Sequence, residues 1–69
     1  MKIYLDKIKL YRLMRENKID SFAELERKLE LKNYSISKAI CAKSIAYRIS
    51  YKLIRFFGCR IDDLLSLED

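Results

Sequence analysis

The chain has no proline and one glycine, Gly58, among its 69 residues. Glycine and proline most often mark tight turns, and a β-sandwich or an alternating α/β sheet needs many of them. Hydrophobic residues make up 51% of the chain, which is enough for a core in a domain of this size. The sequence therefore predicts an all-α fold, organised as a single domain over residues 1–69.

Five segments carry helix signals. Apolar residues recur every three to four positions in segments 6–17, 22–29, 33–42 and 47–57. Ser21 and Glu24 have the spacing of a capping box, which places the start of the second helix just after Ser21. Gly58 stands where a left-handed residue ends the fourth helix, and segment 61–65 begins with carboxylates that favour a helix start. We expect a compact bundle of five short helices.

The periodicity also predicts where particular side chains lie. Residues 3–5 either begin the first helix or form a short extended arm, and the sequence leaves both open. In the second helix the spacing directs Leu25 inward and Glu26 toward water, together with its charged neighbours. Near the end of the chain, Leu64 and Leu65 are expected to close the core.

Several classes of function lack the residues they need. The chain has no histidine, and its two cysteines, Cys41 and Cys59, do not make a zinc set. There is no glycine-rich phosphate loop and no paired nucleophile and base, so we expect no enzyme, cofactor or small-molecule substrate. The thiols are interpreted as reduced rather than disulfide-bonded. Without an apolar run of 18 residues or a signal peptide, the protein is expected to be cytoplasmic, with no membrane partner.

Charge is divided into zones along the chain. Residues 1–30 carry eight basic and six acidic residues, and residues 62–69 carry four acidic residues and no basic one. Between Glu30 and Asp62 there is no acidic residue. This stretch contains the basic residues Lys32, Lys38, Lys43, Arg48, Lys52, Arg55 and Arg60. Such a zone attracts polyanions, which favours double-stranded DNA as a partner, although charged runs are also common on solvated faces.

The helix expected over residues 33–42 lies at the start of this basic zone. Two short helices joined by a turn, the second bearing cations, form the arrangement that places a helix in the DNA major groove. If Ile36, Ala39 and Ile40 face the core, the opposite face carries Asn33, Tyr34, Ser37, Lys38 and Cys41. Asn pairs with adenine, Lys donates to guanine, and Ser bonds base edges or phosphate. The same composition equally fits an ordinary solvated face.

The ordered motifs of the chain resemble those of a known family. They are Ser21-Phe22-Ala23-Glu24-Leu25, Leu29, Leu31, Ser35-Ile36-Ser37-Lys38, Lys43-Ser44-Ile45, Lys52-Leu53-Ile54-Arg55-Phe56-Phe57-Gly58 and Ile61-Asp62-Asp63-Leu64-Leu65. In order and spacing they are similar to the Cro and lambda-repressor-like (XRE-type) helix-turn-helix domain, from about Leu10 to Leu65. The resemblance implies five helices, with the helix-turn-helix at about residues 21–42. It also implies a DNA-binding transcriptional regulator of the phage or mobile-element Cro/repressor type.

The resemblance also implies roles for individual residues. The early part of the third helix would read bases, through Asn33, Tyr34, Ser37 and Lys38. The start of the second helix would contact phosphate, through Ser21 and Phe22. Lys43 and Ser44, in the loop after the reading helix, match positions that commonly contact the DNA backbone. Lys32 and Arg48 are expected to contact phosphate as well, because of their positive charge.

The sequence departs from the family pattern around the reading helix. Glu30 and Ala42 stand where glycine is frequent, and Lys32 stands at the usual Ser or Thr cap. Because a lysine side chain cannot accept a hydrogen bond from a helix N-terminus, Asn33 is expected to take over the capping. The helix start would then shift by one residue.

A second function is also open. The chain could be a small helix-turn-helix modulator or antirepressor that binds another regulator protein and blocks its DNA binding. The exposed aromatic Tyr34 favours this alternative, because aromatic residues are enriched at protein interfaces. On DNA the chain could act as a homodimer, with Leu67 as a dimer contact and two reading helices about 34 Å apart.

Overall fold

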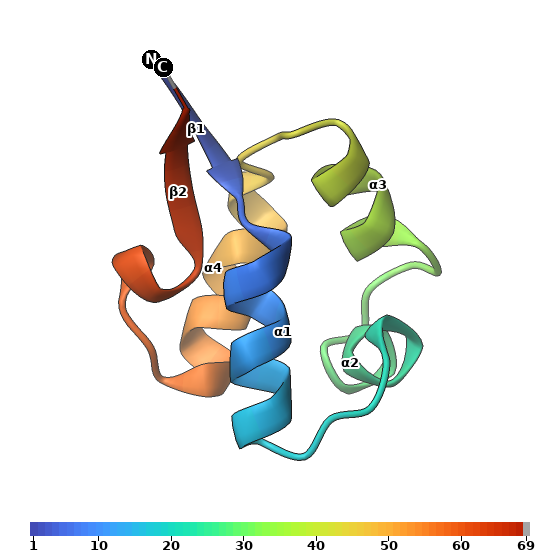
Figure 1. Cartoon of the computed structure of the whole chain (residues 1–69). Helices are drawn as coiled ribbons and strands as arrows, with labels where there is room; N and C mark the ends of the chain where they lie inside the picture. The colour runs from blue at the N-terminus through green and yellow to red at the C-terminus, as the bar shows by residue number, and fades with distance from the viewer. Residues whose placement is uncertain (69) are drawn as a thin grey trace.

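The computed structural model describes residues 1–68 and contains four α-helices. These are α1 (Lys7–Glu16), α2 (Phe22–Lys28), α3 (Ser35–Cys41) and α4 (Tyr47–Phe57). A short 3-10 helix, η1 (Ile61–Asp63), follows α4, and strands β1 (Lys2–Leu5) and β2 (Leu65–Glu68) pair antiparallel. Figure 1 shows α2 and α3 on one side of the molecule and the sheet on the other, with α1 between them.

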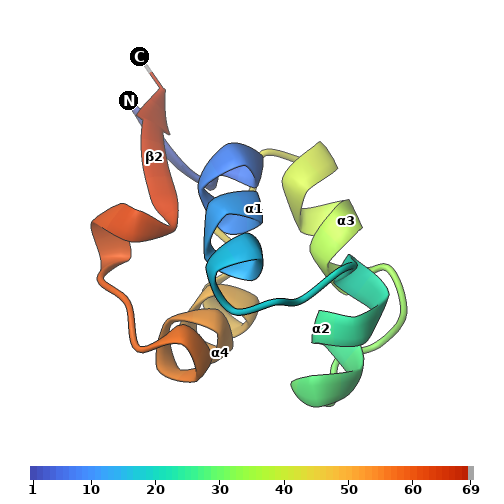
Figure 2. The same ribbon diagram turned by 60° about the horizontal axis from the view of Figure 1, so that its bottom comes forward.

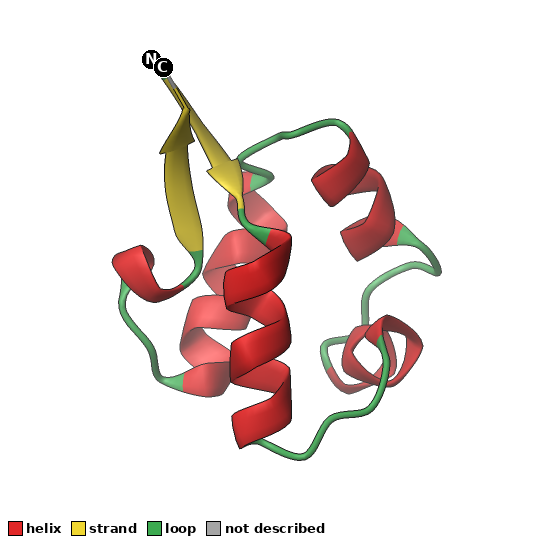
Figure 3. Cartoon of the chain, in the orientation of Figure 1, coloured by secondary structure: helices red, strands yellow, loops and turns green. Residues whose placement is uncertain are grey.

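The expectation of an all-α bundle with five helices is wrong at both ends of the chain, as Figure 3 shows. Of the two alternatives for residues 3–5, the extended arm is confirmed. Segment 61–65 forms one turn of 3-10 helix, and Leu65 then enters β2, where it pairs with Leu5. The Asp6 amide donates to the Leu64 carbonyl at 3.1 Å, so the two segments satisfy backbone groups that neither could satisfy alone.

The four helices and both strands contribute to one hydrophobic core. Its fully buried side chains are Leu5, Leu10, Leu25, Ile36, Leu53 and Leu64, which come from β1, each of the four helices and the residue after η1. Leu65 is also buried, so the prediction that Leu64 and Leu65 close the core is confirmed. The sheet therefore belongs to the same packing unit as the helices.

The start of α1 is tied to the end of the chain. The Asp6 carboxylate accepts hydrogen bonds from the amides of Ile8 (2.9 Å) and Lys9 (3.4 Å), which caps α1. Its second oxygen accepts the Ser66 hydroxyl at 2.6 Å. The Lys9 ammonium donates to the carbonyls of Asp62 and Leu65, both at 2.8 Å. These contacts fix η1 and β2 against α1.

With one glycine available, most of the tight turns use other residues. Gly58 has a φ of 64° and ends α4, as predicted. Left-handed backbone is also found at Lys18, Glu30, Tyr34, Lys43 and Ala46. Glu30 adopts this conformation at a position where the family pattern that the chain resembles often has glycine. Ala42 stands at another such position but is not left-handed, and Lys43 makes that turn instead. Each such non-glycine residue costs roughly 1 kcal/mol, which the rest of the fold must offset.

Candidate nucleic-acid interface

The capping box predicted at the start of α2 is present in modified form. The Ser21 hydroxyl accepts the Glu24 amide at 3.1 Å, as expected. The Glu24 carboxylate accepts the amide of Asp20 at 3.3 Å, one residue before the cap. The Phe22 ring is half-buried and stacks on Tyr11, with centroids 5.3 Å apart and planes 6° apart. The start of α2 is therefore held firmly against α1.

The start of α3 is capped by a residue of α2. Glu26 was expected to face water, but this prediction is wrong because only 3% of the residue is exposed. Its carboxylate accepts hydrogen bonds from the backbone amides of Tyr34 (3.2 Å) and Ile36 (3.0 Å). The first amides of a helix have no intrahelical acceptor, and a carboxylate also complements the helix dipole there. Glu26 thus supplies the cap that the sequence before α3 lacks.

This arrangement corrects two predictions about Asn33. It does not cap the helix, and α3 begins at Ser35, after Tyr34 with a φ of 68°. The sequence contained only an indirect indication that Glu26 caps α3, namely the absence of a good capping residue near Lys32. A helix N-terminus without a local cap needs an acceptor from another element.

The predicted orientation of α3 is confirmed. Ile36 and Ala39 are buried and Ile40 is half-buried against the core, whereas Lys38 and Cys41 are exposed. Tyr34, just before the helix, is 69% exposed. Asn33 is exposed and Ser37 is half-buried. The four residues expected to read bases thus lie at the start of α3 and along its accessible side.

The residues expected to contact phosphate flank α3, but their local contacts differ. Lys32 and Arg48 line the same groove of about 560 Å³, between the turn before α3 and the start of α4. The Ser44 hydroxyl accepts the Ala46 amide at 3.0 Å. The Lys43 ammonium lies 3.3 Å from the Glu68 carboxylate, an exposed salt bridge between the loop after α3 and β2.

Figure 2 places these elements relative to the sheet. The helices α2 and α3 lie together, and α1 separates them from β2. The start of α2, the turn, α3, the following loop and the start of α4 carry the residues expected to touch DNA. Leu67, the expected dimer contact, is on β2 and is 60% exposed.

The two thiols lie in different surroundings. Both cysteines are free, with Cys41 exposed at the end of α3 and Cys59 half-buried after α4. Burial and the nearby charge of Asp63 raise the pKa of the Cys59 thiol. Within residues 1–68, no cluster of His, Cys, Asp and Glu is arranged to hold a metal ion. No helix in that range has the length and apolar character needed to cross a bilayer.

Comparison with known families gives a match over most of the chain. The model of a family described as the Cro/C1-type HTH (helix-turn-helix) DNA-binding domain matches residues 9–69. A comparison with curated proteins found no match, and a comparison with solved structures found none either. The matched region includes all four helices except the first two residues of α1.

Proposed function

The chain belongs to the Cro/C1-type helix-turn-helix DNA-binding family, and from this premise we propose that it is a sequence-specific transcriptional regulator of the phage or mobile-element type. The observation that carries the proposal is the position of α3. Its buried side is anchored in the core, its start is fixed by Glu26, and its accessible side lies within the acid-free stretch of the sequence.

In this proposal α3 enters the major groove and its early residues read base edges. Asn33 offers an amide that pairs with adenine, and Lys38 offers an ammonium for the acceptors of guanine. Ser37 and Tyr34 bring hydroxyl groups that bond base edges or phosphate. The fixed start of α3 supports this role, because base reading requires side chains held in a defined position.

Phosphate contacts would come from both sides of α3. The hydroxyls of Ser21 and Ser44 each accept one amide, which leaves the O–H group free to donate to a phosphate oxygen. The Phe22 ring stacks on Tyr11. The backbone amide of Phe22 is at the first position of α2, where amides have no intrahelical partner. Phe22 would therefore contact phosphate through its backbone.

The cations Lys32, Lys43 and Arg48 would neutralise phosphates and release counterions. Lys43 would have to leave Glu68 to do so. Breaking this salt bridge costs little free energy, because an exposed salt bridge contributes only about 0 to 1 kcal/mol. A phosphate also offers a stronger, charge-assisted hydrogen bond.

We further propose that residues 1–69 act as one binding domain in the cytoplasm and not as an enzyme. The single hydrophobic core supports one domain. Two copies would bind a pseudo-palindromic site with their α3 helices about 34 Å, or a multiple of that distance, apart.

A second function has one observation in its favour. The Tyr34 side chain is 69% exposed beside the accessible face of α3, as an aromatic anchor in a protein interface would be. In that case the chain would modulate another regulator protein, as an antirepressor does. Tyr34→Ala would abolish capture of the regulator, and the chain alone would show no preference among DNA sequences.

Selection of bound duplexes from a random pool tests the main proposal. A pseudo-palindromic consensus is expected, and fluorescence anisotropy on that duplex should give a logarithmic salt slope of about −0.9 per phosphate neutralised. Lys38→Ala should weaken binding by roughly 1 to 3 kcal/mol if it contacts a base.

Arg12→Ala is the matched control, because Arg12 lies on α1 in a groove with Gly58 and Asp62, away from α3. It removes the same charge and should have little effect on affinity. Absence of any enriched sequence, or equal losses in both variants, would contradict reading by α3.

A further inference from the structure

The exposed side of α4 carries basic and aromatic residues that the proposed function does not use. Tyr51, Lys52, Arg55 and Phe56 are all exposed, and positions three or four apart lie on the same side of a helix. Tyr51 is 60% and Phe56 is 43% exposed. The helix contains no acidic residue. This side of α4 therefore presents both positive charge and apolar surface to its surroundings.

Two adjoining grooves run beside this side of α4. One, of about 460 Å³, lies between the end of α2 and the later part of α4. The other, of about 560 Å³, lies between the turn before α3 and the earlier part of α4, and it includes Leu31 and Ile49. Glu30, Tyr51 and Lys52 line both grooves, so the two form a continuous surface. We call this surface the α4 groove.

The α4 groove is preformed. The Lys52 ammonium donates to the Leu29 carbonyl at 3.2 Å, which ties α4 to the end of α2. The Arg55 guanidinium donates to the Tyr51 hydroxyl at 3.1 Å, and its Cζ atom lies 5.6 Å from the centroid of the Tyr51 ring. Each cation keeps further N–H donors, because an ammonium and a guanidinium each have several. A surface that is already ordered loses little conformational entropy when a partner docks.

The charges of the α4 groove are unbalanced, because Glu30 is the one acid among the residues that line it. The cations that line it are Lys28, Lys32, Arg48, Lys52 and Arg55. Among residues 1–68, none of these cations forms a salt bridge. Lys32 and Arg48 belong to the proposed DNA contact, whereas the other three have no role there. An unopposed group of cations favours an acidic partner.

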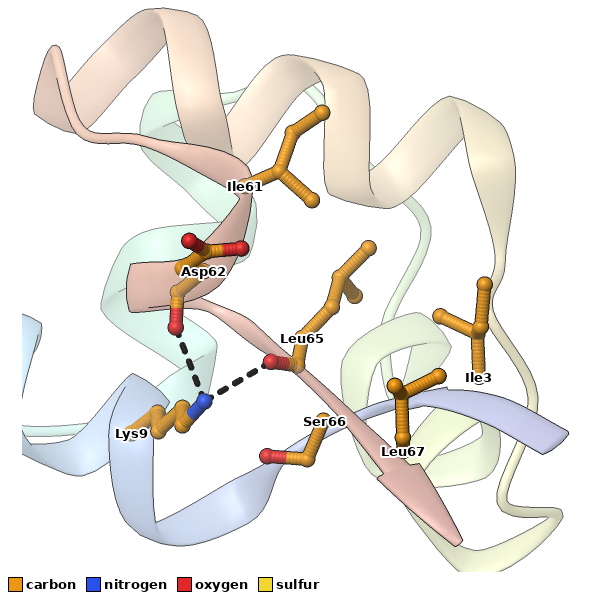
Figure 4. Close-up of a pocket in the computed structure, with 7 residues that line it drawn as sticks. All are labelled: Ile3, Lys9, Ile61, Asp62, Leu65, Ser66 and Leu67. Carbon is orange, nitrogen blue, oxygen red and sulfur yellow. Dashed lines mark hydrogen bonds between the residues drawn. The ribbon is translucent and has the colours of Figure 1, made fainter. Parts of the chain in front are cut away.

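The hydrophobic groove beside the sheet, of about 480 Å³, differs in its charge. Lys9 and Asp62 are the charged residues that line it. Figure 4 shows the Lys9 ammonium with its hydrogen bonds to the carbonyls of Asp62 and Leu65, both 2.8 Å long. One cation and one acid leave no excess of either sign, so this groove does not select a charged partner. The α4 groove does, because its cations outnumber its acid.

The apolar residues of the α4 groove favour a protein segment over nucleic acid. Leu31 and Ile49 line the groove and are half-buried against the core. A phosphate backbone has no apolar group to cover them. Single-stranded nucleic acids bind by stacking bases on aromatic rings, but the Arg55 guanidinium already lies over the Tyr51 ring. Aliphatic side chains of a peptide would cover Leu31 and Ile49 without needing a free ring.

The length of the α4 groove fits a short extended segment. Arg48 and Phe56 are the first and last residues of α4 that line it, and the helix spans about 12 Å between them. An extended chain covers that distance in about four residues, with side chains that alternate between two faces. Carboxylates on such a segment would reach the cations, while the apolar side chains between them face the groove.

We propose that the α4 groove binds an acidic segment of another protein, in which aliphatic or aromatic residues are interspersed with aspartate and glutamate. Its carboxylates would pair with Lys28, Lys52 and Arg55 through charge-assisted hydrogen bonds. The inference goes beyond the proposed function, because this partner contacts α4 and not the accessible side of α3. It also holds whether or not the chain reads DNA.

Selection from a displayed library of random peptides, with the full chain immobilised, tests the proposal. The enriched peptides should combine acidic residues with aliphatic or aromatic ones. A fluorescein-labelled synthetic copy of the most enriched peptide is then the probe, and anisotropy should give a dissociation constant of about 1 to 100 μM. Replacement of its acids by the corresponding amides should abolish binding, as should replacement of its apolar residues by serine.

Two variants locate the contact, each with a matched control. Arg55→Glu should raise the dissociation constant of the probe at least about tenfold, because it replaces a charge-assisted hydrogen bond with repulsion. Arg12→Glu makes the same charge change on the exposed surface of α1, outside the α4 groove, and should have little effect. Tyr51→Ala should also weaken binding, whereas Tyr47→Ala should not, because Tyr47 is 77% exposed on the same helix but lines neither groove. Circular dichroism melts show that each variant folds.

Several results would overturn the proposal. One is a selection that enriches no acidic peptide, and another is an equal loss in Arg55→Glu and Arg12→Glu, which would indicate attraction by net charge alone. If Arg55→Glu leaves peptide binding unchanged but weakens DNA binding far more than Arg12→Glu, the groove contacts DNA instead. If the chain self-associates and Arg55→Glu abolishes the association, the occupant is a second copy. A chain that binds the probe as expected but selects no DNA sequence would support this inference and contradict the proposed function.

Discussion

The Glu26 carboxylate accepts the backbone amide of Ile36 at 3.0 Å, so α3 is capped by the helix that precedes it. The same carboxylate holds the Tyr34 amide, which fixes the left-handed residue before α3. The contact links the two helices of the proposed reading unit directly. A carboxylate buried in this way contributes to stability only while its hydrogen-bond partners stay in place.

Removal of the Glu26 carboxylate should therefore destabilise the start of α3, and with it the fold. Glu26→Ala leaves two amides without acceptors and should lower the free energy of unfolding by about 2 to 4 kcal/mol. Glu26→Gln keeps one acceptor oxygen and should cost less. Urea unfolding measures both, with Glu16→Ala, an exposed glutamate of α1, as the control. Equal stability of Glu26→Ala and Glu16→Ala would show that the buried cap does not stabilise the fold.

The salt bridge between Lys43 and Glu68 should compete with DNA. Glu68→Gln frees Lys43, so DNA affinity should rise by up to about fivefold. This factor corresponds to the roughly 1 kcal/mol that an exposed salt bridge contributes at most. Lys43→Ala should lower the affinity and reduce the magnitude of the salt slope by about 0.9. Anisotropy titrations of the two single variants and the double variant measure the coupling.

Glu16→Gln removes the same charge from α1 and serves as the control for Glu68→Gln. If Glu68→Gln raises affinity no more than Glu16→Gln, the gain is a net-charge effect. Retention of the full gain of Glu68→Gln in the Lys43→Ala background would likewise show that the salt bridge has no part in it.

Asp6 should make stability depend on pH in the acid range. Burial acts to raise the pKa of its carboxyl, but hydrogen bonds from Ser66, Ile8 and Lys9, with the charge of Lys9, bring the pKa below its ordinary value. The folded state thus binds this proton more weakly than the unfolded state. The resulting stabilisation is present above about pH 4 and is lost as the pH falls through the folded-state pKa.

Asp6→Asn isolates this effect, because Asn is also a good helix cap but does not titrate. The free energy of unfolding, measured with urea between about pH 7 and about pH 2, should fall less steeply with acid in this variant. A slope identical to that of the wild type would assign the acid sensitivity to other carboxyls.

The two cysteines should differ in reactivity. Cys41 is exposed, whereas Cys59 is half-buried. The pKa of Cys59 is raised, so near neutral pH a smaller fraction of this thiol is thiolate than of an ordinary cysteine. Iodoacetamide should therefore modify Cys41 first, as mass spectrometry of the folded protein would show.

Specific DNA should slow the modification of Cys41 because this residue is at the end of α3, on its accessible side. The rate at Cys59 provides the internal control and should not change. Equal protection of both thiols would point to a general effect of DNA, and protection of neither would place Cys41 outside the contact.

The sequence by itself predicted the presence of the four α-helices and the orientation of α3. The start of α2 just after Ser21, the end of α4 at Gly58 and the buried side of α3 at Ile36 and Ala39 were all predicted correctly. These features depend on residues within about four positions of each other, because helical hydrogen bonds and capping are local. Local signals also identified the family through the order of its motifs.

Only the tertiary structure decided the sheet and the cap of α3. Leu5 and Leu65 are 60 positions apart, and neither short strand has another strand to pair with until the two ends of the chain meet. Glu26 looks like a surface residue from its helical neighbours, and it becomes buried because α3 presents amides without a local acceptor. Both outcomes depend on unsatisfied backbone groups that find partners across the fold, and spacing along the chain does not encode that choice.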